Sequence, residues 1–500
     1  QRFASSCRRP DSHYRIARNL NYMAKTELSK STFIRALQCL KSVYLNKNRP
    51  FLRDHLEARQ LNKFERGHEI GSLAWKLFPG GIDCSPKHPA AYAKAAAKTT
   101  ELIRRGAKIL YEAVFEYDGI RVLPDILVLN DSQIRMYEVK GSLNISQTYI
   151  LDAALQYYVI SGAGYTPSQT FILHVNKNYI YEGGEIHPED FFVFQDVTAE
   201  VIQQQNFIEL KIPEAKAAVN ADKSPEIPIG PHCYLPYPCD FMGLCWKSIP
   251  ADSPLYLNSI DIHSRFRLVS EGYSSISRIP LDSLDNELLK TEVEARINGK
   301  PIYKASELQK LLQPQKHQVY LKILFIENAV PRLAGTRPFE PLPIAWIAVK
   351  ENGSLIMGDS ENQYQVFSEI INLLRNFLTE DDQLVFWGKP MELLIHQVEF
   401  DLPFLNLESV FQSENLYLPF YLEEKTPENI ASQLGIINDE ITTMNDDEAI
   451  RAWSGESSKG KFNSREIENH LKMQLFLLRE LYRYAAGFIE TDHSIEAKKY

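Results

Sequence analysis

The sequence predicts an α/β protein with two α/β regions. Three observations lead to this prediction. Apolar residues recur at helical spacing up to Gly106, and from there to Lys140 they alternate with a period of two, as in strands. A helical segment and a further strand follow, so the two kinds of element are interleaved. From about residue 318 a second mixed stretch begins, and it ends in a long amphipathic helix.

Length and composition are those of a globular protein. The 500 residues are enough for two or three domains, and 44% are hydrophobic and 24% charged. No apolar run reaches the roughly 18 residues of a membrane helix, so we expect no membrane span. Six cysteines are too few for a disulfide scaffold, which favours a cytoplasmic location. Residues 1–22 hold five arginines and no apolar core, and we interpret them as a disordered leader.

Positive charge is concentrated in the first part of a chain whose net charge is −9. Residues 23–66 contain ten Lys or Arg against four Asp or Glu, and residues 87–108 contain six against one, which together gives +11. Solvated helix faces are the ordinary explanation of such stretches. A surface that binds the phosphate backbone of a nucleic acid is the functional one.

The elements follow in order along the first region. We expect helices over about 29–49, with Cys39 on it, over 55–78 and over 90–105. Strands are expected over 107–117, 121–129 and 134–140, joined by turns at Asp118-Gly119 and at 130–132. A helix over 148–162 and a strand over 170–176 complete the unit. Residues 212–232 contain four prolines and are expected to form a loop.

Two carboxylates and a lysine border the second and third of these strands. Asp125 interrupts an apolar run, and Glu138 and Lys140 are two residues apart, so they share one face of a strand. Two carboxylates can hold Mg²⁺ or Mn²⁺, and a nearby lysine can stabilise the charge that develops during phosphodiester hydrolysis. The alternative is that three charges merely solvate strand ends.

Further residues could complete such a site. Gln156 lies on the helix that follows, and the segment FERGHEIG offers His68 and Glu69 as a ligand from an earlier helix. Glu112, on the strand before the hairpin, is a weaker candidate acid. A surface histidine is an equally good interpretation of His68.

Three of the six cysteines are crowded near the end of the first region. Cys233, Cys239 and Cys245 are separated by five residues each, without the paired spacing typical of zinc sites. Three thiolates and a distant fourth, Cys39, suit a [4Fe-4S] cluster. Zinc, with His232 as a spare ligand, and buried cysteines without a cofactor are the alternatives.

These motifs together resemble the iron-sulfur nucleases of the RecB and AddB type, which have a restriction-endonuclease-like PD-(D/E)XK fold. The segments LSKSTFIRALQCLKSVYLNKN, YEVKGS, PYPCDFMGLCW and AGTRPFEPLPIAW are similar to the bacterial domain of unknown function 2779 family. The resemblance implies a nuclease domain over 23–249, a connector over 250–317 and an RNase H-like exonuclease domain of the DnaQ type over 318–490. It implies Asp125 and Glu138 as metal ligands, Lys140 and Gln156 as catalytic residues, and Cys39, Cys233, Cys239 and Cys245 as cluster ligands.

Two departures from the family pattern matter. Arg66-Gly67 is followed by Gly71 where RecB-type enzymes have a histidine, so His68 and Glu69 are only substitutes. In the second domain the family's acids fall on Lys322, Leu324, Asn406 and Gln474, which cannot hold two cations, although a shifted register could bring in Glu327. The sequence therefore predicts a DNA nuclease with one intact site. The alternatives are an inactive scaffold that retains both nuclease folds and, less favoured, a redox-sensing regulator.

Overall fold

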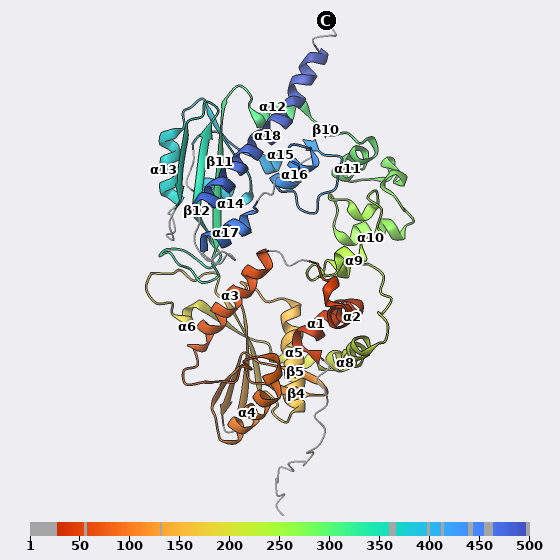
Figure 1. Cartoon of the computed structure of the whole chain (residues 1–500), viewed down its shortest axis with the longest axis vertical. Coiled ribbons are helices and arrows are strands. Elements are labelled where there is room, and N and C mark those ends of the chain that lie inside the picture. The colour runs from red at the N-terminus through yellow and green to blue at the C-terminus, as the bar shows by residue number, and fades with distance from the viewer. Residues whose placement is uncertain are drawn as a thin grey trace, which may run out of the picture.

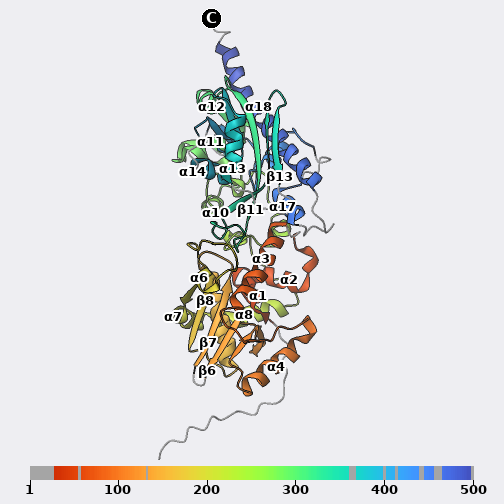
Figure 2. The same cartoon turned by 90° about the vertical axis from the view of Figure 1, so that its left-hand side faces the viewer.

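The computed structural model describes residues 28–54, 58–130, 133–359, 367–397, 401–411, 415–438, 444–454 and 464–496. Two bodies lie one above the other along the longest axis of the molecule (Figure 1), and the same stacking is visible in the perpendicular view (Figure 2). Each body contains a mixed sheet and helices, which confirms the predicted α/β class. The predicted leader, residues 1–22, lies outside the described residues.

The first body is built on a six-stranded sheet with the order β2-β3-β6-β7-β8-β9. Only the pairs β2/β3 and β7/β8 are parallel. A smaller sheet, β1-β5-β4, lies beside it. The strands are β1 (Leu28–Ser29), β2 (Ile82–Asp83), β3 (Ile109–Tyr111), β4 (Phe115–Tyr117), β5 (Ile120–Val122), β6 (Ile126–Asn130), β7 (Gln133–Lys140), β8 (Gln169–Val175) and β9 (Phe192–Asp196).

Two of the strands predicted from periodicity are each broken in two, and this corrects the prediction. The first divides at Glu112, whose φ of 49° is left-handed, into β3 and β4. The second divides before Asp125 into β5 and β6, where Pro124 has no N–H for a ladder. The two breaks lie opposite each other, because the Glu112 N–H donates to the Asp125 carbonyl at 3.1 Å. The predicted turn at Asp118-Gly119 is confirmed, with φ of 47° and 65°.

Helices cover both faces of the large sheet. One face packs on α1 (Lys30–Gln38), α5 (Gln147–Gly162), α7 (Thr198–Gln203) and α8 (Gln205–Asn220), through a core that includes Met136. The other face, with Tyr137 and Val139, packs on α3 (Ala58–Trp75). Also in this body are α2 (Leu40–Asn48), α4 (Tyr92–Arg104), α6 (Pro188–Phe191) and α9 (Met242–Cys245).

Two predictions about helices are wrong. The first predicted helix is interrupted at Cys39, which is extended (φ −160°, ψ 118°) and separates α1 from α2. The segment expected as a loop from residue 212 is helical as far as Asn220, because Ile212, Ala215 and Val219 recur at helical spacing and are buried. Pro213 lies inside that helix, and the loop begins only at Ala221.

The segment expected as a connector contains α10 (Ile262–Ser270), α11 (Glu287–Asn298), β10 (Ile302–Tyr303) and α12 (Ala305–Leu312). Its last part joins the second body: β10 pairs with β16 (Leu416–Tyr417), and Leu308 and Leu312 lie in the core around the last helix.

The second body has a five-stranded sheet with the order β13-β12-β11-β14-β15. Its strands are β11 (His317–Glu327), β12 (Pro341–Lys350), β13 (Leu355–Asp359), β14 (Asp382–Phe386) and β15 (Phe404–Asn406). One face packs on α13 (Phe367–Phe377) and α14 (Lys389–Gln397). The other packs on α15 (Leu407–Phe411), α16 (Pro427–Gln433), α17 (Asp446–Ser454) and α18 (Ser464–Glu496).

An arm of the second body, residues 328–340 between β11 and β12, packs into the first. Its Ala329 and Val330 are buried in the core beneath α3. The Tyr181 N–H donates to the Thr336 carbonyl at 3.0 Å, and the Gly335 N–H donates to the Tyr181 carbonyl at 2.7 Å. Within the part of the chain that the structure describes, no helix combines the length and the apolar character needed to cross a bilayer.

Candidate active site and cysteine pocket

The candidate site is centred on Glu138 near the end of β7. Alternation along the strand places Met136, Glu138 and Lys140 on the face that packs against α1 and α5. The Glu138 side chain is only 1% exposed. A carboxylate this deeply buried stays ionised only if charged or hydrogen-bonding partners offset its loss of hydration.

Three groups supply that compensation. The Glu138 Oε1 atom accepts from the Lys30 Nζ atom at 2.7 Å and from the Lys140 Nζ atom at 2.8 Å. The Oε2 atom accepts from the Gln156 Nε2 atom at 2.6 Å. Burial raises the pKa of Glu138, but Lys140 and Lys30 outweigh it, so the pKa is well below its ordinary value. Glu138 is therefore an anion held between two cations.

A second carboxylate, Asp152 on α5, orients the lysines. Its Oδ2 atom accepts from the Lys140 Nζ atom at 2.6 Å and lies 3.7 Å from the Lys30 Nζ atom. Burial lowers the pKa of Lys140, but Glu138 and Asp152 raise it by more. Lys140 also lies 5.0 Å from the centre of the Tyr149 ring, a cation–π contact. Lys140 is thus a fixed positive charge rather than a proton donor.

The remaining acids come from the two strand breaks. The Asp125 Oδ2 atom accepts from the Val139 N–H at 2.6 Å, which fixes this carboxylate beside β7. Burial and the charge of Glu138 raise the pKa of Asp125 well above its ordinary value. The same two causes raise the pKa of Glu112 to about 7. Both shifts reflect burial first and the nearby charge of Glu138 second.

His68 and Glu69 are placed differently from the other expected site residues. Both lie on α3, which packs on the opposite face of the sheet from Glu138. His68 is exposed, and the Glu69 carboxylate accepts from Arg332 of the arm. The structure brings Asp125, Glu138, Lys140 and Gln156 together and does not add His68 or Glu69 to the partners of Glu138.

Sequence reasoning missed Lys30 and Asp152 and gave Glu112 too little weight. Asp152 precedes Gln156 by four residues, so both lie on one face of α5. An acid in an otherwise apolar helix, one turn before the expected site glutamine, was a usable signal. Lys30 had no such signal, because it is one of ten basic residues in its stretch.

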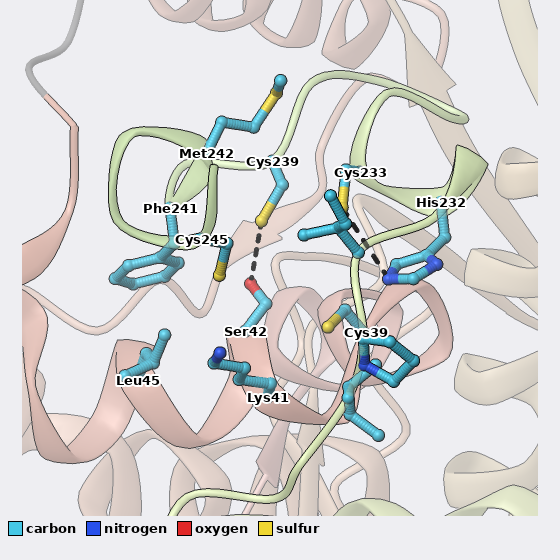
Figure 3. A pocket seen from close by; sticks show the side chains of 13 residues that line it. Cys39, Lys41, Ser42, Leu45, His232, Cys233, Cys239, Phe241, Met242 and Cys245 are labelled. Carbon is cyan, nitrogen blue, oxygen red and sulfur yellow. Dashed lines mark hydrogen bonds between the residues drawn. The ribbon is translucent and has the colours of Figure 1, made fainter. Parts of the chain in front are cut away.

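The four expected cluster cysteines line one pocket. Cys39 enters from the junction of α1 and α2, and Cys233, Cys239 and Cys245 enter from the segment that follows α8, with Cys245 at the end of α9. Figure 3 shows their sulfur atoms turned toward a common space, with Ser42 and His232 at its edge. The break at Cys39 is what turns this side chain out of the helix and into the pocket.

The thiols of the pocket have few polar partners. The Cys239 Sγ atom lies 3.6 Å from the Ser42 Oγ atom, and the Cys233 Sγ atom lies 3.9 Å from the His232 Nε2 atom. Burial raises the pKa of Cys39 and of Cys245. Among the described residues, no three Cys, His, Asp or Glu side chains are arranged to hold one metal ion as they stand, here or at Glu138.

In the second body the four positions expected to have lost their acids are all engaged in other contacts. Lys322 on β11 donates to the Asp446 Oδ2 atom at 2.6 Å, and the Asp446 Oδ1 atom lies 2.8 Å from the His470 Nε2 atom. Of the other three positions, Leu324 is buried, the Asn406 amide donates to Glu392 and the Gln474 amide donates to Glu428. Glu327, the acid that a shifted register would bring in, is exposed at the end of β11.

Comparisons with known proteins add little to this geometry. No family model and no curated protein matches the chain. Among solved structures, the crystal structure of SSO0001 matches 41% of this chain and 90% of its own, at 9% identity and a TM-score of 0.16. A likeness at this level supports no argument about fold or function.

Proposed function

We propose that this chain is a metal-dependent nuclease that hydrolyses DNA phosphodiester bonds, more readily in single strands or from ends. The observation that carries the proposal is the charge balance at Glu138. Among the described residues the site combines four carboxylates with two ammonium groups, so with every carboxylate ionised there would be two negative charges in excess: Glu112, Asp125, Glu138, Asp152, Lys30 and Lys140. One divalent cation has the charge that offsets this excess.

Each side chain has a role that follows from its contacts. Asp125 and Glu138 would hold Mg²⁺ or Mn²⁺, with Glu112 as a third oxygen donor. Bound there, the ion would polarise the phosphate and lower the pKa of a water molecule. Lys140 lies beside Glu138 and can stabilise negative charge that develops on a phosphate oxygen. Gln156 fixes the orientation of Glu138, and Asp152 fixes that of Lys140.

The cysteine pocket supports a [4Fe-4S] cluster as a structural cofactor. Four thiols converge from two segments almost 200 residues apart, and four thiolates are the ligand set of such a cluster. Cys39, Cys233, Cys239 and Cys245 would bind it and tie α1 and α2 to the loop after α8. Zinc, which the same thiols could bind after rearrangement, is the lesser alternative.

The fold details fit the same proposal. A mixed sheet whose acids project toward α1 and α5 suits a PD-(D/E)XK nuclease domain. The order β13-β12-β11-β14-β15, with β14 and β15 parallel to β11, suits a degenerate RNase H-like domain. On this interpretation Lys322 takes the place of a cation beside Asp446. The resemblance of the sequence to the domain of unknown function 2779 family is part of this proposal.

A catalytically inactive nucleic-acid-binding protein or scaffold is the second candidate. The ion pair of Lys322 with Asp446 favours this candidate. Because Lys322 stands where the family has an acid, the second body would keep the fold of a nuclease without its metal-binding acids. The basic segments 23–66 and 87–108 would bind nucleic acid in either case.

The substitution Lys140→Met distinguishes the active nuclease from the inactive scaffold, because only an active nuclease has cleavage to lose when this lysine is removed. Labelled single-stranded and duplex DNA is incubated with the anaerobically purified protein and Mg²⁺ or Mn²⁺. We expect cleavage that EDTA abolishes and that Lys140→Met reduces by about 10²-fold or more, because a fixed charge at the reacting phosphate is lost. Lys216→Met is the matched control, since Lys216 is a half-buried lysine in an ion pair with Asp118, at 2.7 Å, in the same body. Equal cleavage by wild type and Lys140→Met would contradict the proposal.

A further inference from the structure

Lys30 reaches the candidate site from outside the strand that carries Glu138 and Lys140. It is the first residue of α1, after the cap residue Ser29, whose hydroxyl accepts from the Thr32 N–H at 3.2 Å. Pairing of β1 with β5 fixes this start of the helix beside the small sheet. The Lys30 side chain is 26% exposed, against 1% for Glu138.

The two lysines on Glu138 are not equivalent. Lys140 is held by Glu138 at 2.8 Å and by Asp152 at 2.6 Å, so it has two close carboxylate partners. Lys30 has one close partner, Glu138 at 2.7 Å, and a second carboxylate, Asp152, at 3.7 Å. Of the two, Lys30 is therefore the more easily displaced.

Both oxygen atoms of Glu138 are already in use. Oε2 is bound by Gln156, and Oε1 is shared by the two lysines. A carboxylate oxygen can accept more than one contact, but a divalent ion that binds Glu138 would lie close to two ammonium groups and would be repelled by both. Displacement of one ammonium group is the simplest way to admit the ion.

We propose that Lys30 is a tethered cation that occupies the metal-binding oxygen of Glu138 and moves onto Asp152 when a divalent ion binds. The inference rests on the proposed metal-dependent function and specifies how that site is regulated. A lysine suits this exchange, because its ammonium group is a compact charge with rotatable donors on a flexible stem. Asp152 is already 3.7 Å away, so the movement is short. Lys30 thereby sets the concentration of cation at which the site fills.

Competition between the Lys30 ammonium group and a divalent ion for Glu138 is measured as the affinity of metal-depleted protein for Mn²⁺, without nucleic acid. Isothermal titration calorimetry is run on wild type, Lys30→Met, Lys30→Gln, Glu138→Gln and the matched ion-pair control Lys216→Met. Lys30→Gln keeps a donor for Glu138 without the charge, so it covers the case in which Lys30→Met does not fold. Thermal unfolding with and without Mn²⁺ gives a second readout.

We expect both Lys30 variants to bind Mn²⁺ at least about tenfold more tightly than wild type, because the ion no longer displaces a positive charge. Their melting temperature should be lower than that of wild type without metal and should rise more when Mn²⁺ is added. Lys216→Met should bind like wild type, and Glu138→Gln should not bind.

The possible failures are distinguishable. Equal or weaker binding by the Lys30 variants, with loss of binding in Glu138→Gln, would overturn the inference and leave the proposed metal site standing. Binding that does not depend on Glu138, or no binding by wild type and the Lys30 variants alike, would overturn both.

Discussion

At the scale of single residues, two groups of charged side chains differ in balance, one centred on Glu138 and the other on Asp446. Around Glu138 the carboxylates outnumber the cations, and burial together with the charge of Glu138 raises the pKa of Glu112 to about 7. Around Asp446 one carboxylate faces Lys322 and His470, and its pKa falls well below the ordinary value despite partial burial. An excess of negative charge suits a site that receives a cation, whereas a satisfied ion pair suits a structural role.

The ion pair of Asp446 leads to a prediction about acid stability. Because the folded-state pKa of Asp446 is depressed, its contribution is present above the unfolded-state pKa of about 4 and is lost as the pH falls below it. We expect Asp446→Asn to lower the free energy of unfolding of the second body by about 1 kcal/mol at pH 7, since the half-exposed carboxylate is screened by solvent. The difference from wild type should shrink between pH 5 and pH 3 in urea unfolding. Asp381→Asn, at an exposed position of the same body, is the control. A difference that is constant over this range would contradict the ion-pair explanation.

Sequence patterns predicted that Asp125, Glu138, Lys140 and Gln156 lie close together, because alternation along a strand and the register of a tight hairpin are local properties. They could not identify Lys30, which reaches the site only because β1 pairs with β5, about 90 residues later in the chain. They also placed His68 and Glu69 at the site, because a sequence does not show which face of a sheet a distant helix covers.

At the scale of elements, three of the candidate residues lie where regular structure is interrupted. Cys39 separates α1 from α2, Glu112 separates β3 from β4, and Asp125 lies between β5 and β6. Each interruption was hidden from periodicity, because apolar residues continue on both sides of it. Left-handed backbone at Glu112 costs about 1 kcal/mol or more.

The break at Cys39 leads to a prediction about iron. Anaerobically purified protein should be brown and contain iron, and Cys39→Ser should lose most of it and unfold at a lower temperature, because a lost ligand uncouples α1 and α2 from the loop after α8. Cys84→Ser is the matched control, since Cys84 is buried in the same body but does not line the pocket. Iron content is measured by elemental analysis. A colourless protein with stoichiometric zinc, or equal loss of iron in both variants, would refute the cluster.

At the scale of the whole molecule, the two bodies are joined on more than one side. The arm of residues 328–340 inserts Val330 into the first body and pairs Arg332 with Glu69. The chain also passes between the bodies through the segment from α10 to α12, on the other side of the view in Figure 1. A residue first considered as a ligand, Glu69, therefore contributes to the contact between the bodies. The second body is packed onto the first and is not a freely tethered appendage.

The most direct test of the central claim compares cleavage with binding in Glu138→Gln. Binding of labelled single-stranded DNA is measured with Ca²⁺, and single-turnover cleavage of the same DNA is measured with Mn²⁺. The account predicts binding within about threefold of wild type, because the basic segments are unchanged, and cleavage slower by about 10³-fold, because the buried carboxylate that would hold the cation is neutralised. Wild-type protein that binds DNA but does not cleave it, or equal cleavage by both proteins, would contradict the claim that Glu138 lies at the centre of a working nuclease site.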